Sequence, residues 1–284
     1  MSPRRWLALA RESLSAWSAD YVPRMGAALS YYTLFSIAPL LLIAISVAGF
    51  VFGEDAARGE IFEQLRGLMG EQGAAAVERL LQSAHRPAAG GIAAAIGVAV
   101  LILGASGVFT ELQNDLDRIW RVPPERKSGW WNLLRTRLLS FGMVLGMAFL
   151  LIVSLVASAA LSALGKWWAP LFTGWELLAH GADLLVSFAL MSVMFATLYK
   201  VMPRARVAWR DVWIGAGVTA ALFAVGKFAI GLYLGRSSVA SAFGAAGSLV
   251  VVMVWVYYSA QIFLLGAEFT RVCAHAHGSM TARR

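Results

Sequence analysis

The chain has 284 residues, of which 59% are hydrophobic and 14% are charged, and its formal net charge is +8. A soluble domain carries about 25% charged residues, so a surface in contact with water on all sides is excluded. A bilayer accounts for the deficit, because helix surfaces that face lipid need no polar cover. The single cysteine, Cys273, excludes an internal disulfide and any site with several cysteine ligands.

Six segments are apolar over the roughly 20 residues that a helix needs to cross a bilayer. The sequence therefore predicts an all-α membrane protein, a polytopic bundle of six transmembrane helices. We expect a cytoplasmic amphipathic helix in residues 1–26, a transmembrane domain in residues 27–272 and a cytoplasmic tail in residues 273–284. The predicted transmembrane helices cover residues 27–52, 91–109, 138–164, 184–201, 212–234 and 242–272.

The N-terminal segment is amphipathic. Its apolar helical face consists of Trp6, Leu7, Ala10, Leu14 and Trp17, and the nearby cations are Arg4, Arg5 and Arg11. This pattern is typical of a helix that lies on the cytoplasmic membrane surface and is attracted to anionic lipid.

The basic residues predict the orientation of the chain. The seven successive connecting segments, counted with Lys200 and Arg271 at the ends of the adjoining helices, hold 4, 4, 6, 1, 4, 1 and 3 Lys or Arg residues. Basic loops stay on the cytoplasmic side, so we expect both termini in the cytoplasm of a bacterial inner membrane. Only the second segment departs from alternation; it is net acidic, and acidic residues contribute little to this rule.

The first predicted transmembrane helix contains Pro39, which frees the carbonyl of Phe35 and favours a kink. A bent helix can line a transport path, but proline is also common in ordinary membrane helices. After this helix, apolar residues follow helical spacing on both sides of Gly70 and Gly73. We expect a helical hairpin on the outer membrane interface between helices 1 and 2.

The second predicted transmembrane helix continues into the cytoplasm over residues 111–121. Its cytoplasmic polar face consists of Glu111, Asn114, Asp115 and Arg118. Pro123 and Pro124 then end the helix, because proline lacks the backbone donor and clashes with the preceding turn.

Lys227 lies inside the fifth predicted transmembrane helix. A lysine in hydrocarbon is costly, so such residues usually line a cavity or have a partner. Asp183, near the outer end of the fourth helix, is at a compatible depth. The alternative is that Lys227 extends along its own stem to the outer headgroups.

The sixth predicted transmembrane helix carries a polar stripe. Its members are Tyr257, Tyr258, Gln261 and Glu268, spaced to lie on one side of the helix. The stripe predicts a surface that faces a cavity or transport path. The alternative is a hydrogen-bonded packing seam with Glu268 near Arg271.

Motifs of catalysis are missing from the sequence. It has no Gly-Lys-Ser/Thr phosphate loop, no Gly-x-Ser-x-Gly and no His-Glu-x-x-His. Asp115 and Asp117 are two residues apart and point to different helix faces, unlike the converging carboxylates of a two-metal nuclease. His275 and His277 beside Cys273 fit a mobile tail better than a metal site. We expect no enzyme activity, no cofactor, no metal site and no nucleic-acid partner.

Three stretches together resemble one family. They are ALSYYTLFSIAPLLL over residues 28–42, ELQNDLDRIWR over residues 111–121 and WVYYSAQIFLLGAE over residues 255–268. In order and spacing they are similar to the YihY / virulence factor BrkB family of bacterial inner-membrane proteins. The family's second motif usually contains Ala-Leu-Asn followed by Trp, whereas this chain has Asp115, Leu116 and Asp117 before Trp120.

The resemblance implies a six-helix plasma-membrane protein tied to envelope integrity and serum resistance, with lipid or lipopolysaccharide handling. The family's old label, ribonuclease BN, is widely regarded as a misassignment. We expect transport or flipping of a lipid or other envelope amphiphile. The alternative is a non-transporting membrane scaffold, and a ribonuclease is the least favoured hypothesis. The sequence predicts membrane lipids as partners, with anionic lipid at the cytoplasmic face, and it does not determine the oligomeric state.

Overall fold

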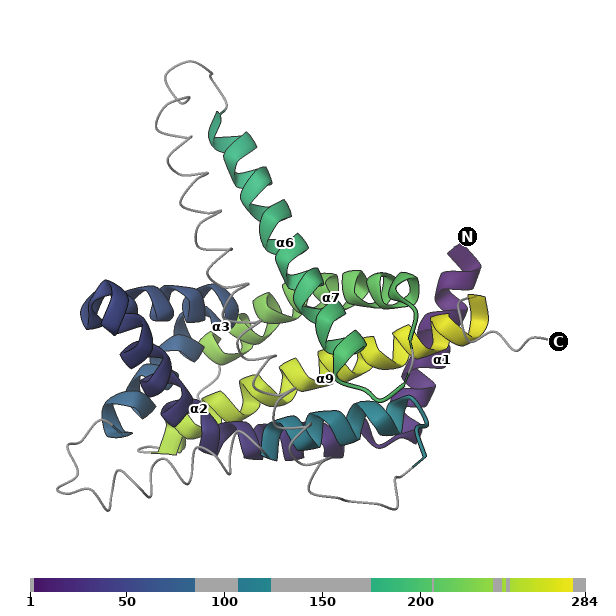
Figure 1. Ribbon diagram of the computed structural model, residues 1–284, viewed down its shortest axis with the longest axis horizontal. Coiled ribbons are helices and arrows are strands. Elements are labelled where there is room, and N and C mark those ends of the chain that lie inside the picture. The colour runs from purple at the N-terminus through teal and green to yellow at the C-terminus, as the bar shows by residue number, and fades with distance from the viewer. Residues whose placement is uncertain are drawn as a thin grey trace. The chain divides into compact units, whose positions relative to one another are not determined.

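The computed structural model describes residues 3–84, 107–123, 175–205, 207–236, 242–243 and 246–277 (Figure 1). These residues form helices and no strand. The labelled helices are α1 (Pro3–Ala19), α2 (Val22–Phe52), α3 (Glu54–Ala84), α6 (Trp175–Val201), α7 (Trp209–Arg236) and α9 (Gly247–His277). A further helix covers residues 107–119.

Three described helices are long and apolar enough to cross a membrane. These candidate spans are Leu184–Val201, Trp209–Leu234 and Gly247–Ala276. The first coincides with the fourth predicted transmembrane helix, and the others overlap the fifth and sixth, except that the fifth begins at Trp209 and not at residue 212 and the sixth covers Gly247–Ala276 and not residues 242–272. The predicted segment 138–164 and all of 91–109 except its last three residues lie outside the described residues, so the number of six remains a prediction.

The boundary between α1 and α2 lies earlier than the sequence predicts. Tyr21 adopts a left-handed backbone conformation with φ 57°, and α2 begins at Val22, so residues 22–26 belong to α2. Pro23 explains the position, because its fixed φ suits the first turn of a helix and its missing N–H costs nothing there. Hydropathy shows where the segment becomes apolar, near residue 27. The helix itself begins about one turn earlier, at Val22.

The segment after α2 is helical and is interrupted at Gly70. Its φ of 73° and ψ of 173° divide α3 into two helical stretches. Phe62 from the first stretch and Leu81 from the second belong to one buried cluster with Ile45 of α2. The interruption agrees with the predicted break near Gly70, while the placement of a hairpin on the outer membrane interface remains a prediction.

The chain forms two compact units. The first contains Met1–Ala10, Leu116–Ala221 and Gly266–Arg284, and the second contains Arg11–Asp115 and Leu222–Leu265. The core of the second unit combines residues from α3, α7 and α9. Its buried members include Val77, Ile230, Leu234 and Val252.

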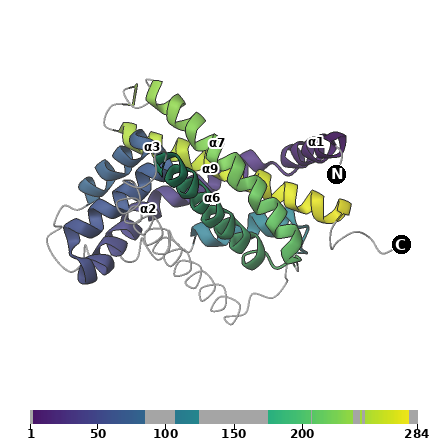
Figure 2. The same cartoon turned by 90° about the horizontal axis from the view of Figure 1, so that it is seen from above.

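In the first unit, α7 crosses α9 (Figure 2), and the two helices pack against each other through two threonines and two glycines. A Cβ atom added to Gly215 of α7 would lie 2.7 Å from the Cβ of Thr270. A Cβ atom added to Gly266 of α9 would lie 2.9 Å from the Cβ of Thr219. Because residue 215 faces 270 and residue 219 faces 266, the two helices run antiparallel and their backbones approach closely.

The threonine hydroxyls in this contact are satisfied within their own helices. Thr219 donates to the carbonyl of Gly215, and Thr270 donates to the carbonyl of Gly266, both at 2.7 Å. The hydroxyl of the fully buried Tyr199 from α6 lies 2.9 Å from that of Thr219. Since Thr219 gives its proton to Gly215, Tyr199 is the donor. We call these five residues, Tyr199, Gly215, Thr219, Gly266 and Thr270, the glycine–threonine contact.

We expect Gly215→Ala to destabilise the protein, whereas Gly217→Ala does not. An added methyl at Gly215 meets Cβ of Thr270, which no side-chain rotation removes, while nothing lies within 4 Å of a Cβ at Gly217. Overpacking of this kind typically costs about 1–3 kcal/mol. At Gly217 alanine's better helix propensity, up to about 1 kcal/mol, is unopposed.

The measurement is the thermal unfolding midpoint of each purified variant in the same detergent. A midpoint for Gly215→Ala equal to that of Gly217→Ala would show that the two helices do not approach as closely as described.

Candidate functional site

The residues of the polar stripe predicted on α9 differ in their burial and in their contacts. Tyr257 is half-buried and Tyr258 is 45% exposed, and their rings meet edge to face with centroids 5.6 Å apart. Gln261 is half-buried and Glu268 is completely buried. The regular spacing of the stripe along the helix therefore does not give its members one common environment.

Gln261 packs against the beginning of α2. Its Nε2 atom donates to the carbonyl of Val22 over 3.4 Å, and a Cβ on Gly26 would lie 3.2 Å from its Cδ atom. Its Oε1 atom is buried and accepts no hydrogen bond from the described residues. Gln261 is consequently a residue of a helix contact in the second unit, with one acceptor still available.

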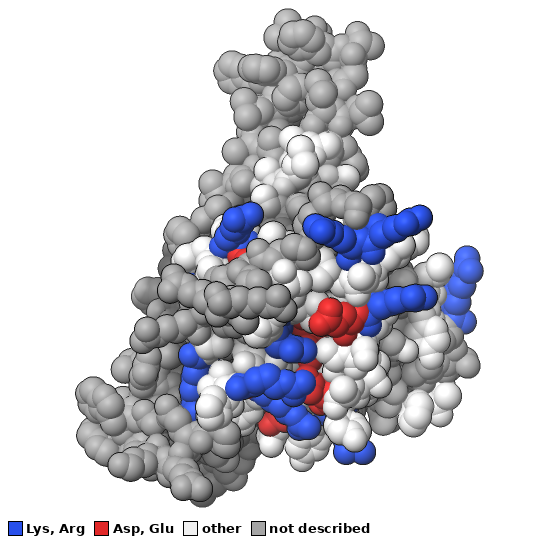
Figure 3. Space-filling view, turned by 90° about the vertical axis from the view of Figure 1, so that its right-hand side faces the viewer, with Lys and Arg blue, Asp and Glu red and all other residues white. Residues whose placement is uncertain are grey.

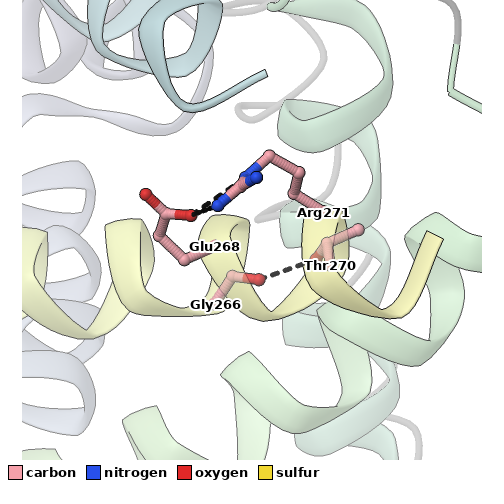
Figure 4. A network of polar contacts seen from close by, with 4 residues as sticks. All are labelled: Gly266, Glu268, Thr270 and Arg271. Carbon is pink, nitrogen blue, oxygen red and sulfur yellow. Dashed lines mark hydrogen bonds and ion pairs between the residues drawn. The ribbon is translucent and has the colours of Figure 1, made fainter. Parts of the chain in front are cut away.

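Glu268 forms an ion pair inside α9 (Figure 4). Its Oε2 atom accepts from Arg271 Nε at 3.1 Å and from a terminal guanidinium nitrogen at 2.9 Å. Arg271 is 15% exposed. A buried carboxylate is costly unless it is paired, so Arg271 supplies the charge that Glu268 needs. This is the contact that the packing interpretation predicted; a cavity-lining role for Glu268 stays a prediction.

Lys227 points to α3 in the second unit. Its Nζ atom donates to the carbonyl of Gly67 at 3.1 Å, and the residue is half-buried. Among the described residues no carboxylate pairs with it. Asp183 lies in α6, and its side chain is outside what the structure describes, so the predicted proximity of Lys227 and Asp183 stays a prediction.

Pro39 lies within α2, which is helical from Val22 to Phe52. Two serines near it bond to their own helix: Ser30 donates to the carbonyl of Ala27 at 2.8 Å and Ser36 to that of Thr33 at 3.2 Å. These two serine hydroxyls are thus satisfied within α2. The side chain of Pro39 is outside the described residues, and its role in a kink stays a prediction.

The predicted cytoplasmic polar face is only partly exposed. Asn114 and Arg118 are exposed and Glu111 is half-buried, but Asp115 is only 4% exposed. The helix covers residues 107–119 and is followed by Arg121, whose φ of 56° is left-handed. The amide of Val122 donates to the carbonyl of Asp117 and so caps the helix before Pro123 and Pro124.

Asp117, at which the chain departs from the family pattern, joins this helix to the connection between α6 and α7. Its Oδ1 atom accepts from the backbone N–H of Arg204 at 2.7 Å, and its Oδ2 atom lies 3.5 Å from Arg204 Nε. Asp117 is 9% exposed. Lys200 donates to the carbonyl of Val207 from the other side of the connection. The hydrogen bonds to Arg204 and Val207 therefore fix the connection between α6 and α7 at two points.

Basic and acidic side chains share the face of the molecule shown in Figure 3, with Lys and Arg in blue and Asp and Glu in red. In the first unit Arg118 and Arg210 are exposed, and the side chain of Arg204 is 39% exposed beside Asp117. Within the described residues, no three His, Cys, Asp or Glu side chains lie close enough together to hold a metal ion.

The family model of virulence factor BrkB matches residues 13–284. The chain belongs to the virulence factor BrkB family. This finding confirms the resemblance carried by the three sequence stretches. No solved structure matches this BrkB-family chain.

Curated relatives of the BrkB-family chain are UPF0761 membrane proteins. The chain is 29% identical over 268 residues to one from Ralstonia nicotianae, covering 92% of this chain and 57% of the relative. It is 29% identical over 258 residues to one from Tolumonas auensis, covering 88% and 80%, and 26% identical over 284 residues to one from Acinetobacter baylyi, covering 99% and 65%. The chain thus spans just over half to four-fifths of these relatives' lengths.

These relatives and the apolar helices together make the BrkB-family chain a membrane protein. The fully buried Glu268 is then placed inside a candidate span, where an uncompensated charge is especially costly.

We expect Asp117→Ala to loosen the connection between α6 and α7, and Asp117→Asn to retain most of its stability. Asparagine keeps an acceptor for the Arg204 amide, whereas alanine leaves that amide without it, at a cost of about 1–3 kcal/mol. The ion pair with the partly exposed Arg204 side chain adds little. Hydrogen exchange at residues 202–208 should accelerate in Asp117→Ala only; equal acceleration in both variants would make the charge, and not the backbone bond, the decisive interaction.

For the Glu268–Arg271 pair we expect Glu268→Leu to destabilise more than the double change Glu268→Leu with Arg271→Leu. Removing one partner of a buried ion pair leaves the other charge uncompensated and typically costs about 3–5 kcal/mol, whereas replacing both removes the stranded charge. Thermal unfolding of the single and double variants, with Arg271→Leu completing the cycle, gives the coupling energy. Additive effects would mean that the two residues stabilise the protein independently.

Proposed function

We propose that this BrkB-family protein is a multi-pass protein of a bacterial inner membrane, with both termini in the cytoplasm, that transports or flips a lipid or other amphiphile. The six transmembrane helices and the outer interfacial hairpin are part of this proposal. Its support comes from the three candidate spans, the family and one cation at membrane depth.

That cation is Lys227. It lies inside the candidate span Trp209–Leu234, where a lysine costs about 2.5–3.5 kcal/mol on insertion scales. In the described residues its partner is a neutral carbonyl, that of Gly67, and not a carboxylate. An ammonium group has three donors, so Lys227 can bind an anionic headgroup and keep its bond to Gly67. This observation carries the proposal and favours an amphiphile with a negative charge.

The remaining members of the predicted site have unequal support. Tyr257 and Tyr258 belong to the same unit as Lys227, and the exposed Tyr258 suits the lining of a path. Gln261 and Glu268 are occupied in helix contacts, so the proposal does not depend on them.

The alternative is a non-transporting scaffold for envelope integrity. It is favoured by the engagement of Gln261 and Glu268 in contacts between or within helices, which is what a rigid bundle requires. In this alternative the contribution of Lys227 is the hydrogen bond that joins α7 to α3. Neither hypothesis involves a catalysed reaction or a nucleic-acid partner.

We expect Lys227→Met to abolish lipid movement and Lys227→Arg to retain it. The test uses the full chain in vesicles of phosphatidylethanolamine and phosphatidylglycerol with a trace of fluorescent phosphatidylglycerol, whose outer-leaflet fraction is bleached by dithionite. The wild-type protein should move the inner-leaflet probe to the outer leaflet, where dithionite bleaches it. The assay is run both with and without an imposed proton gradient. Arg236→Met is the matched control, because it removes an exposed cation from the last turn of the same helix.

The outcomes separate the two hypotheses. Wild-type vesicles that bleach no further than protein-free vesicles, under either energy condition, would exclude flipping of phospholipid. If Lys227→Met also supported normal envelope integrity in cells, the scaffold would be the better account. Equal loss in Lys227→Met and Arg236→Met would assign the effect to general charge and not to Lys227.

A further inference from the structure

We propose that the outward face of α1 is a docking surface for anionic phospholipid. We define this surface by Arg4, Leu7, Arg11 and Leu14. It is independent of the Lys227 path, because it concerns how the N-terminal helix meets the membrane and not what crosses it.

The burial pattern of α1 separates two faces. Leu9 and Ser13 are 4% and 2% exposed, and they lie four residues apart on the face that packs inward. Leu7 and Leu14 are 67% and 55% exposed and lie seven residues apart, two turns along the opposite side. The helix therefore buries a face with one leucine and a serine, and it leaves its more apolar pair of leucines uncovered.

The inward face of α1 already has a partner within the first unit. Leu9 packs in a cluster with Phe269, Val272 and Cys273 of α9. Trp6 stacks on Phe269 with ring centroids 5.9 Å apart and an angle of 10° between the planes. Because these α9 residues are in the last turns of the candidate span Gly247–Ala276, this part of α1 lies at the end of a membrane span. A helix beside the end of a membrane span lies close to the lipid headgroups, which is the position that the proposal gives to α1.

The charges on the outward face select the kind of lipid. Arg4 precedes Leu7 by three residues, and Arg11 precedes Leu14 by three residues, so each leucine has an arginine beside it on the helix surface. Both arginines are exposed, and Glu12 is the single acidic residue of α1. Leucines that enter the acyl boundary with arginines at phosphate level form a membrane-surface helix, and its affinity rises with the negative charge of the lipid.

A depth measurement on the full chain tests the docking. Single cysteines are placed at Leu7, Leu14 and Glu12 in a Cys273→Ala background that is first checked for unchanged thermal stability, and each is labelled with a nitroxide. In vesicles containing phosphatidylglycerol, the labels at 7 and 14 should collide with oxygen in preference to a water-soluble nickel chelate. The label at the exposed Glu12 position, on the far side of the helix, should show the reverse preference.

The anionic requirement has its own test. Raising phosphatidylglycerol from none to about 30 mol% in phosphatidylcholine should lower nickel access at position 7 by roughly twofold or more, as the surface charge draws the helix inward. The variant Arg4→Gln with Arg11→Gln should lose this response, whereas Arg5→Gln, outside the defined surface, should keep it. The same double variant should still move lipid in the dithionite assay, which distinguishes failure of this proposal from failure of the transport proposal.

Three results would overturn the proposal. Equal nickel access at positions 7, 12 and 14 in both lipid mixtures would place the outward face in water. Low access of positions 7 and 14 to both oxygen and nickel would mean that protein covers the face, either a second copy of the chain or another partner. A phosphatidylglycerol response retained in the double variant would leave the arginines without the role assigned here.

Discussion

The close approach of α7 and α9 at the glycine–threonine contact is the interaction on which the first unit depends. Lipid offers helices no hydrophobic drive to associate, so contact area between backbones has to supply the attraction. Glycine allows that approach, and each threonine hydroxyl bonds to a carbonyl of its own helix, leaving its methyl group and Cβ for packing. Tyr199 adds α6 to the pair through one further hydrogen bond. The same stretch of α9 also holds the Glu268–Arg271 ion pair, so the charge is buried beside the close contact of the two helices.

Polar residues in apolar helices of this protein serve two different purposes. The ion pair with Arg271 offsets the cost of burying Glu268, and a hydrogen bond to α2 offsets the cost of burying Gln261. Lys227 has a neutral partner and retains capacity for a charged one. Because Lys227 carries a charge and its described partner is neutral, we propose it, and not Gln261 or Glu268, as the residue that binds an amphiphile.

The structure gives a role to Asp117, a position at which the chain departs from the family pattern. An asparagine at this position would accept the Arg204 amide equally well, so the backbone bond does not need the charge. The aspartate adds an ion pair with the same residue. The consequence is a connection between α6 and α7 that is held by helix 107–119, in addition to the bond from Lys200 to Val207.

Composition and periodicity by themselves determined that this chain is a helical membrane protein, because too little charge and apolar runs of about 20 residues have no other stable solution. They also located the helices around Lys227 and Glu268 and identified the family from three local motifs. Only the tertiary structure decided which polar residues have partners: the Arg204 amide on Asp117, α2 against Gln261 and α3 beside Lys227 come from segments distant in sequence. Helical spacing says which residues share a face, but the partner of that face depends on packing between helices, which periodicity does not encode.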